Sequence, residues 1–338
     1  MLHTVSGATG LLGSHLVYAL LKEGKKVRAL HRSSSDKSLL ERVFGYYGDD
    51  LKNYNELLEW QEADLLDPVD VAAAMAGTDC FFHAAALVSF DPKDREALIR
   101  GNQKITANAV NAALEQNVSR FVHVSSVAAL GRKPDQKEFD EQSFWVESDL
   151  NSNYAKGKYA AEMEVWRGIE EGLSAAIINP CIILGPGTWD GGSAAIFKNI
   201  AEGFKFYSHG INAYVDVRDV VKALLILAAG SQQERFVIAA ENWTYKEVFD
   251  KIAEALEVAK PKIEIKPWMA ALAWRWEALK SRLTGSKPLV TKETARTAQE
   301  QFYYISDKAK KDLGLNFRPL MESITFTGDC YRKDHPLS

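Results

Sequence analysis

The sequence is poor in cysteine, in long apolar runs and in net positive charge, and each shortage excludes a class of protein. Its 338 residues include three cysteines, Cys80, Cys181 and Cys330, which lie far apart with no paired spacing. That spacing predicts neither a disulfide framework nor a metal-ligand cluster, and it fits a reducing compartment. No apolar run is long enough to span a bilayer. A net charge of -4 argues against a general nucleic-acid binder, because such proteins are usually basic.

The remaining composition is that of a soluble globular protein. Charged residues make up 25% of the chain and hydrophobic residues 46%. A chain of 338 residues can bury a substantial core, and its length predicts two domains or one large α/β unit. The first expected strand begins almost at Met1, so we expect no signal peptide and predict a cytoplasmic protein.

The chain opens with a pattern typical of a dinucleotide-binding turn. Leu2 to Val5 is a short apolar run, and it is followed by three glycines spaced three apart and then by an amphipathic pattern that stops at Gly24. Strand, glycine turn and helix in this order are the context that a dinucleotide fingerprint requires. Glycines let the backbone approach a pyrophosphate, and the helix N-terminus supplies amide donors. We therefore expect cofactor contacts from Gly7, Thr9, Gly10, Leu11, Leu12 and Gly13.

The residues after the second expected strand, Lys26 to Leu30, bear on the choice of cofactor. An acidic residue about 20 positions after the glycines binds the ribose diol of NAD, whereas an arginine accommodates the extra phosphate of NADP. Here His31 occupies the usual acidic position, Arg32 follows it, and Lys37 lies nearby. Because a guanidinium can contact a phosphate through two nitrogens, the sequence favours NADP(H). NAD(H) remains the alternative cofactor, and a solvated surface arginine is the simpler explanation of Arg32.

Two further segments are expected to meet the cofactor where strands end. Trp60 to Asp64 is the third expected strand, and the Asp64 carboxylate would accept a hydrogen bond from the adenine amino group while Leu65 covers the ring. Small residues at the end of a parallel strand suit a cofactor that lies across the sheet edge. Tight helix packing explains such residues equally well. The fourth expected strand ends in Ala84, Ala85 and Ala86.

Three residues further along are suited to proton transfer at a carbonyl. Tyr154 and Lys158 lie four positions apart at the head of an expected long helix, which puts both on one helical face. A neighbouring ammonium favours the phenolate and lowers the phenol pKa from its ordinary ~10. Ser126 follows the fifth expected strand, Phe121 to Val124, where side chains point into the ligand crevice of a parallel sheet. We predict that Ser126 polarises a carbonyl, Tyr154 moves the proton, and Lys158 holds Tyr154 and the nicotinamide ribose.

These motifs together resemble the extended short-chain dehydrogenases/reductases, the superfamily of NAD-dependent epimerases and dehydratases. The match covers about residues 5 to 221. Besides the motifs above, it includes Asn102, Asn179-Pro180, Gly185 to Gly187 and Val215 to Val220. The resemblance implies an α/β fold, a Rossmann-type doubly wound parallel sheet of seven strands with a smaller C-terminal substrate domain, and often a homodimer through a four-helix bundle. It also implies a catalytic set of Ser126, Tyr154 and Lys158, with Asn102 in support. Ile177 to Leu184 is expected as the sixth strand, and its Pro180 and Ile182 are expected near the nicotinamide.

The resemblance also implies a division of the chain and a branch of the superfamily. Residues 1–180 and about 211–238 would form the dinucleotide-binding domain, and residues 181–210 and 239–330 the substrate domain. The segment from Val27 to Ser33 is similar to the dihydroflavonol reductase branch, which uses NADPH. A dehydratase would usually carry an acidic pair where Val127 and Ala128 stand. Lys198 and Lys205 are the only cations between residues 187 and 214, which argues against a nucleotide diphosphate as substrate.

We therefore predict an NADP(H)-dependent oxidoreductase that reduces a hydrophobic ketone or aldehyde, or runs the reverse reaction. One alternative is a sugar-nucleotide epimerase that retains NAD, and another is a dinucleotide-binding sensor or scaffold without turnover. The intact set of Ser126, Tyr154 and Lys158 weighs against the sensor, which has no need of a proton donor.

A tryptophan-rich stretch, Trp268 to Leu283, is the last feature that the sequence singles out. Trp268, Leu272, Trp276 and Leu279 fall on one stripe of an expected helix. The preferred interpretation is a small domain that packs its own core. A hydrophobic substrate lid and a contact with a membrane surface are the alternatives.

Overall fold

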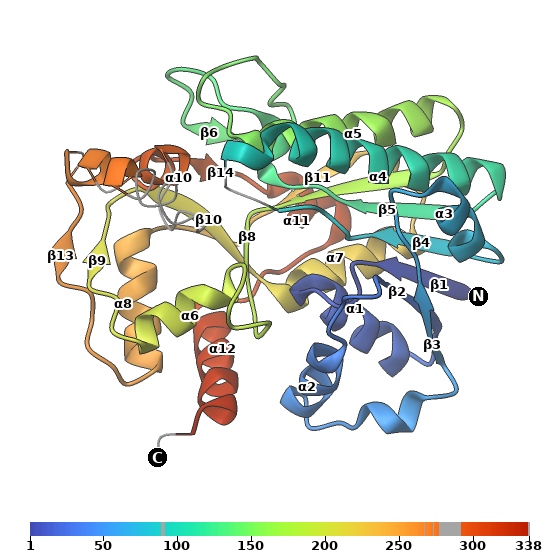
Figure 1. Ribbon diagram of the computed structural model, residues 1–338, viewed down its shortest axis with the longest axis horizontal. Coiled ribbons are helices and arrows are strands. Elements are labelled where there is room, and N and C mark those ends of the chain that lie inside the picture. Colours follow the sequence, from blue (N-terminus) through green and yellow to red (C-terminus); the bar gives the residue numbers. More distant parts are fainter. Residues whose placement is uncertain (89–91, 267, 273, 277–291, 337–338) are drawn as a thin grey trace.

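The computed structural model describes residues 1–88, 92–266, 268–272, 274–276 and 292–336. A large sheet with helices on both faces occupies one side of the molecule, and a smaller unit lies at the edge where the strands of the large sheet end (Figure 1).

The large sheet has seven strands in the order β11-β7-β5-β4-β1-β2-β3. Every adjacent pair is parallel, so all seven carboxyl ends meet at one edge. The order reverses between β1 and β4, which is where ligands bind in open α/β sheets. The predicted doubly wound parallel sheet is confirmed. Its strands are β1 (Leu2–Ser6), β2 (Lys26–His31), β3 (Leu58–Glu62), β4 (Cys80–His83), β5 (Arg120–Val124), β7 (Ala175–Pro180) and β11 (Arg235–Ile238).

Helices bury one apolar stripe each against the two faces of this sheet. In α7 the stripe is Val220, Leu224 and Leu227, which recur at the helical period and are fully buried. One face carries α3 (Pro68–Met75), α4 (Arg95–Glu115) and α5 (Asn153–Glu170). The other carries α1 (Leu11–Lys22), α2 (Ser38–Tyr46), α7 (Val217–Ala229) and α11 (Asp307–Leu313). Short 3-10 turns are η1 (Leu51–Tyr54), η2 (Pro92–Asp94) and η3 (Val127–Leu130).

The smaller unit is built on a three-stranded sheet with the order β12-β10-β8. Its core includes Trp189, Phe197, Tyr214, Ile252 and Ile324. Its main elements are β8 (Ile182–Leu184), α6 (Ala194–Ala201), β10 (Ile211–Asp216), β12 (Glu241–Thr244), α8 (Tyr245–Ala255) and α12 (Leu320–Asp334). Two short parallel pairs, β9 (Phe206–Tyr207) with β13 (Ile263–Glu264) and β6 (Glu138–Phe139) with β14 (Tyr303–Tyr304), and the helix α10 (Lys292–Thr297) complete the fold.

Two boundaries differ from the sequence expectation. The segment expected as one strand from Ile177 to Leu184 is two strands in two sheets, because β7 pairs with β11 as far as Pro180 and β8 pairs with β10 from Ile182 onward. The amide of Cys181 still donates to the carbonyl of Ile238 at 3.1 Å, so the chain leaves the large sheet after that residue. Residues 211–216, expected in the dinucleotide-binding domain, form the central strand of the small sheet.

The tryptophan-rich stripe does not form a core in the described residues. Trp268, Leu272 and Trp276 are 62%, 59% and 68% exposed, whereas the preferred interpretation required their burial. Leu279 and Leu283 lie outside the described residues. In the described part of the chain, no helix combines the length and the apolarity needed to cross a bilayer.

Candidate active site

The glycine turn closes tightly against the end of β4. Gly7 has a φ of +71°, and a Cβ atom there would lie 2.8 Å from the amide nitrogen of Ala85. A Cβ atom on Gly13 would overlap the carbonyl oxygen of Gly7. The turn is closed by Gly10, whose amide donates to the Gly7 carbonyl at 3.0 Å. Only glycine fits at residues 7 and 13, so the backbone of the turn is left bare for a ligand to approach.

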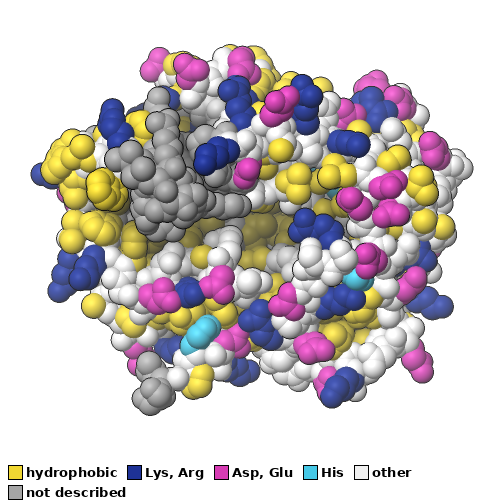
Figure 2. Space-filling model, viewed as in Figure 1, with side chains coloured by type: hydrophobic (Ala, Val, Ile, Leu, Met, Phe, Trp, Pro, Cys, Tyr) yellow, Lys and Arg dark blue, Asp and Glu magenta, His cyan; other side chains and the backbone are white. Residues whose placement is uncertain are grey.

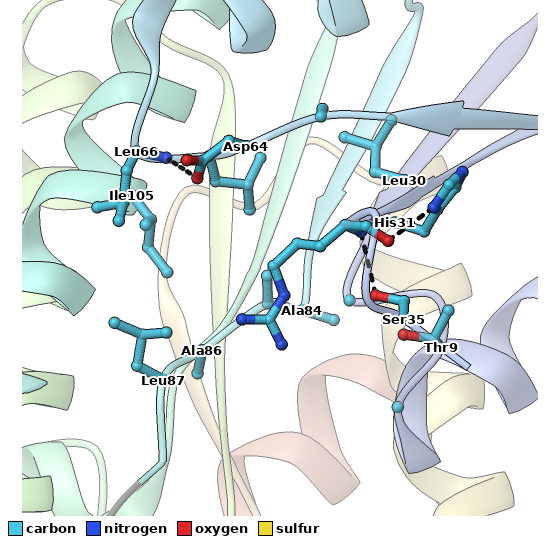
Figure 3. Close-up of a pocket in the computed structure, with 16 residues that line it drawn as sticks. Thr9, Leu30, His31, Ser35, Asp64, Leu66, Ala84, Ala86, Leu87 and Ile105 are labelled. Atoms are coloured by element: carbon cyan, nitrogen blue, oxygen red, sulfur yellow. Dashed lines mark hydrogen bonds between the residues drawn. The ribbon is translucent and has the colours of Figure 1, made fainter. Parts of the chain in front are cut away.

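A cavity of about 280 Å³ lies beside this turn, at the carboxyl ends of β1, β2, β3 and β4 (Figure 3). Asp64 and Leu66 stand on one side of it, and Thr9 and Ser35 stand on the other. Its lining brings together nine of the residues predicted to bind the cofactor: Gly7, Thr9, Gly10, Arg32, Asp64, Leu65, Ala84, Ala85 and Ala86.

Eight residues of the predicted cofactor set do not line this cavity: Leu11, Leu12, Gly13, Lys37, Tyr154, Lys158, Pro180 and Ile182. Leu12 is a buried residue of α1, Leu11 packs against Gly187, and Gly13 serves the closure of the turn. Lys37 is turned toward Trp60, with its Nζ 5.0 Å from the centroid of the indole ring. Lys37 is therefore placed for a cation–π contact and not for a phosphate in this cavity.

Pro180 and Ile182 lie elsewhere, at the joint between β7 and β8. Neither residue lines the cavity beside the glycine turn.

The structure adds lining residues that the sequence reasoning missed. They share a position at or just beyond the end of a strand, and the order of the parallel strands is the signal that would have found most of them. Ile105 comes instead from α4, and only packing places it. The added residues are Leu30, His31, Ser35, Ala63, Leu66, Leu87 and Ile105.

The residues of the cavity fit a dinucleotide, since a bare glycine turn lies beside a lining that includes Arg32 and Asp64. Arg32 lies in the lining, and its amide donates to Ser35 Oγ at 3.0 Å, which fixes the turn after β2. His31, and no acid, ends β2, and its Nδ1 lies 2.9 Å from the Arg32 carbonyl oxygen. Asp64 accepts from the amide of Leu66 at 2.9 Å, which holds its carboxylate at the cavity wall.

The predicted catalytic residues come together at the end of β5 and the start of α5. Ser126 stands at the start of η3, where its Oγ accepts from the amide of Ala128 at 3.2 Å. Tyr154 lies in the first turn of α5, and its side chain is hydrogen bonded to that of Ser126. Lys158, one turn later, is 3% exposed and donates from Nζ to the carbonyl of Val124 at 2.8 Å. All three side chains are therefore fixed by the same two elements.

Burial sets the protonation of these groups. It raises the pKa of Tyr154, and the hydrogen bond to Ser126 opposes that effect. The spacing of Tyr154 and Lys158 predicts a lowered phenol pKa, and that direction is wrong here because desolvation of the phenolate outweighs the favourable contacts. Burial also lowers the pKa of Lys158 to about 8, while the carboxylate of Glu162 acts in the opposite sense. At neutral pH the site therefore holds a neutral phenol beside an ammonium.

Asn102 braces the loop that follows β4. Its side chain is buried, its Oδ1 accepts from the amide of Leu87 at 2.8 Å, and its Nδ2 donates to the carbonyls of Leu87 and Leu98 at 2.9 and 3.0 Å. This amide is engaged with main-chain groups beside the cofactor cavity, so its contacts are those of a positioning residue.

The model of the NAD dependent epimerase/dehydratase family matches residues 3–239. A Synechocystis sp. protein described as a dihydroflavonol 4-reductase is 32% identical over 324 residues, which cover 92% of this chain and 89% of the relative.

A plant enzyme and a solved structure are similar over nearly the whole chain. Cinnamoyl-CoA reductase 1 of Petunia hybrida is 29% identical over 331 residues, covering 95% of this chain and 89% of the relative. The crystal structure of gox2253 superposes with a TM-score of 0.80 at 29% identity, covering 100% of this chain and 99% of that one.

Proposed function

The chain belongs to the NAD dependent epimerase/dehydratase family and is an NAD(P)-dependent enzyme of the short-chain dehydrogenase/reductase type, and from this premise we propose that it reduces a ketone or aldehyde with NADPH, or runs the reverse reaction. The observation that supports the proposal most directly is the hydrogen-bonded pair of Ser126 and Tyr154, with the buried Lys158 one helical turn away. This is a proton donor, a second hydroxyl and a fixed cation beyond the carboxyl end of β5, the strand next to β4, whose own end carries the cavity.

In this proposal each residue has one task. A nicotinamide cofactor, when bound, would supply hydride chemistry at the carbonyl carbon. Ser126 donates a hydrogen bond to the carbonyl oxygen, and Tyr154 delivers the proton that the oxygen needs. Lys158 holds the ribose and stabilises the phenolate that Tyr154 leaves behind. A phenol whose pKa is raised by burial is protonated at neutral pH, which suits the reductive direction.

The preference for NADPH over NADH is part of the proposal. Its support is Arg32 in the cavity lining, together with His31 where an NAD-binding acid would end β2. The glycine turn and Asp64 would bind NADPH and NADH equally well.

The proposed substrate is a small hydrophobic carbonyl compound. The two curated relatives are described as a dihydroflavonol reductase and a cinnamoyl-CoA reductase, both reductases of small organic molecules. Val127 is buried next to Ser126 and is followed by Ala128, so the acidic pair that a dehydratase would carry there is missing.

Replacing Tyr154 tests the reaction. Tyr154→Phe removes the proton donor and keeps the ring, so we expect NADPH oxidation with a panel of hydrophobic ketones and aldehydes to fall by about two orders of magnitude or more. NADPH binding, measured by calorimetry, should stay within a few-fold of wild type. A variant that retains most of its turnover would remove Tyr154 from the mechanism.

Replacing Arg32 tests the cofactor. Wild type should bind NADPH more tightly than NADH in titration calorimetry, and Arg32→Ala should abolish the difference by losing a contact to the additional phosphate. Lys37→Ala is the matched control, because Lys37 contacts Trp60 and does not line the cavity, and it should keep the preference. Tight NAD binding, or NAD already bound after purification, would favour a sugar-nucleotide epimerase instead.

We also propose that the protein is a cytoplasmic homodimer. The cytoplasmic location rests on three cysteines that are all free and buried. The dimer would form through α4 and α5, which pack together on one face of the large sheet. Sedimentation equilibrium measures the dimer directly, and a monomer at micromolar concentration would contradict it.

A further inference from the structure

A buried carboxylate lies one helical turn beyond Lys158. Glu162 is 2% exposed and belongs to α5, and four donors from four places in the fold surround it. Its Oε2 accepts from Ser125 Oγ at 2.5 Å and from Asn179 Nδ2 at 2.7 Å. Its Oε1 accepts from Arg235 at 3.2 Å and from the indole nitrogen of Trp166 at 3.3 Å. Every contact is a donor, which is the set of partners that a carboxylate can accept.

This anion is connected to the reacting residues on both sides. Residues four apart on a helix are neighbours, so Glu162 stands next to Lys158 on α5. The donor Ser125 directly precedes Ser126, and the donor Asn179 also gives a hydrogen bond to the Ser126 carbonyl at 3.0 Å. The anion is therefore fixed between the ammonium and the main chain of the serine, while it lies too deep to touch a substrate.

We infer that Glu162 is a positioning residue that acts through Lys158, because its fixed negative charge keeps the buried ammonium protonated at the pH where the enzyme works. The effect of this charge on the reaction rests on the proposed function. Its physical content, a coupling between two buried charges, does not depend on the substrate or the cofactor.

The charges around Lys158 make the direction of the coupling clear. Burial lowers the pKa of Lys158 to about 8, and Glu162 is the group that raises it. From β4 and β5, His83 and His123 face the ammonium, and burial followed by the charge of Lys158 lowers the pKa of both, that of His83 to about 3. Both imidazoles are thus neutral at working pH, and so is the phenol of Tyr154 on the preceding turn. None of these three groups could supply the negative charge that is lost when Glu162 is replaced by a neutral residue.

Arg235 allows a second test of the coupling, because its charge is opposite to that of Glu162. It approaches Glu162 from β11 and also donates to the carbonyls of Glu141 and Ser143. Its positive charge offsets part of the field that Glu162 exerts on Lys158. Removing the carboxylate should therefore lower the pKa of Lys158, and removing the guanidinium should raise it.

The experiment follows the Lys158 side chain directly. Protein labelled with ¹³C-lysine is titrated between pH 6 and 11 by NMR at the ε-carbon, and the Lys158 signal is identified by its loss in Lys158→Met. Glu162→Gln should shift the midpoint of Lys158 down by about one pH unit or more. Arg235→Gln should shift it up, and Glu162→Asp, which keeps the charge, should stay close to wild type. An unchanged midpoint in Glu162→Gln, or a downward shift in Arg235→Gln, would overturn the inference.

A second readout separates this inference from the proposed function. NADPH affinity, followed by nucleotide fluorescence against pH, should begin to weaken about one pH unit lower in Glu162→Gln than in wild type. If the NMR midpoints move as expected and NADPH affinity does not follow them, the coupling stands and the proposed contact of Lys158 with the ribose fails. If Glu162→Gln does not fold, the direction of the shift in Arg235→Gln still decides the inference.

Discussion

Lys158 shows how the surroundings of a side chain change its chemistry. A lysine ordinarily has a pKa near 10.5, and burial of this one lowers the pKa to about 8. In the unfolded chain the ordinary value returns, so folding at neutral pH forces a charged group into a site that disfavours it. The enzyme therefore loses stability in order to hold a cation beside Tyr154.

Lys158→Met should accordingly stabilise the protein while removing turnover. The difference between 10.5 and about 8 corresponds to roughly 3 kcal/mol at pH 7, less the lost hydrogen bond to Val124. Chemical denaturation at pH 7 measures the gain in the free energy of unfolding.

The stability gained by Lys158→Met should decrease as the pH rises. Between pH 8 and 10.5 the unfolded chain binds this proton and the folded chain does not, so the wild type gains stability as pH rises. The advantage of Lys158→Met should shrink over that interval. A constant advantage, or none at pH 7, would contradict the lowered pKa.

Sequence patterns name the candidate catalytic residues but not their states. The spacing of Ser126, Tyr154 and Lys158 points to them only together with the glycine turn upstream, and the structure brings the three together. The direction of the Tyr154 pKa shift depends on burial, which no local pattern reveals. Glu162 is likewise ordinary in sequence, because its partners Asn179 and Arg235 come from distant strands.

Among the elements, the glycine turn is the one that sequence predicts best. The reason is steric and local: a Cβ on Gly13 would overlap the carbonyl of Gly7 within the same turn. Strand ends are harder, since β7 and β8 form one apolar run that only Asn179 and Pro180 interrupt. Both strands consist mainly of apolar residues without alternation, so hydrophobic pattern does not separate them.

Gly13→Ala should disrupt the turn and the cofactor cavity together. We expect a loss of about 1–3 kcal/mol in the free energy of unfolding, from forced displacement of the Gly7 backbone, and loss of NADPH binding. Calorimetry and urea denaturation measure the two effects.

Gly45→Ala is the matched control for that change. Gly45 lies in α2, has no atom within 4 Å of the position of a new Cβ, and has no positive φ. The control should be neutral or more stable by about 0.5–1 kcal/mol and should bind NADPH normally. Equal losses in both variants would remove the steric explanation.

At the scale of the whole molecule, helix α12 connects the small unit to the large one. Near its end Asp334 accepts hydrogen bonds from Tyr46 of α2 and, at 2.8 Å, from the indole nitrogen of Trp189. Arg42 of α2 lies 3.5 Å from the same carboxylate. Nothing in the sequence links residue 334 to residues 42, 46 and 189, since the link exists only after both units have formed.

Asp334→Ala should loosen this connection. Leaving the buried indole of Trp189 without its acceptor costs about 1–3 kcal/mol, so the thermal midpoint should fall by several degrees. Asp329→Ala is the control, because Asp329 forms only a surface ion pair with Arg332 at 2.7 Å among the described residues, and it should change stability by less than about 1 kcal/mol. Equal effects would show that α12 contributes no specific connection.

The chain passes from the large sheet into the small one after Pro180. This passage has a consequence for exchanging the small unit between related proteins. β12 is separated in sequence from β8 and β10 by α7 and β11, which belong to the large unit. Any continuous fragment that spans the small sheet therefore carries part of the other unit with it. Transplanting the substrate unit between relatives requires at least two separate grafts, one on each side of residues 217–238.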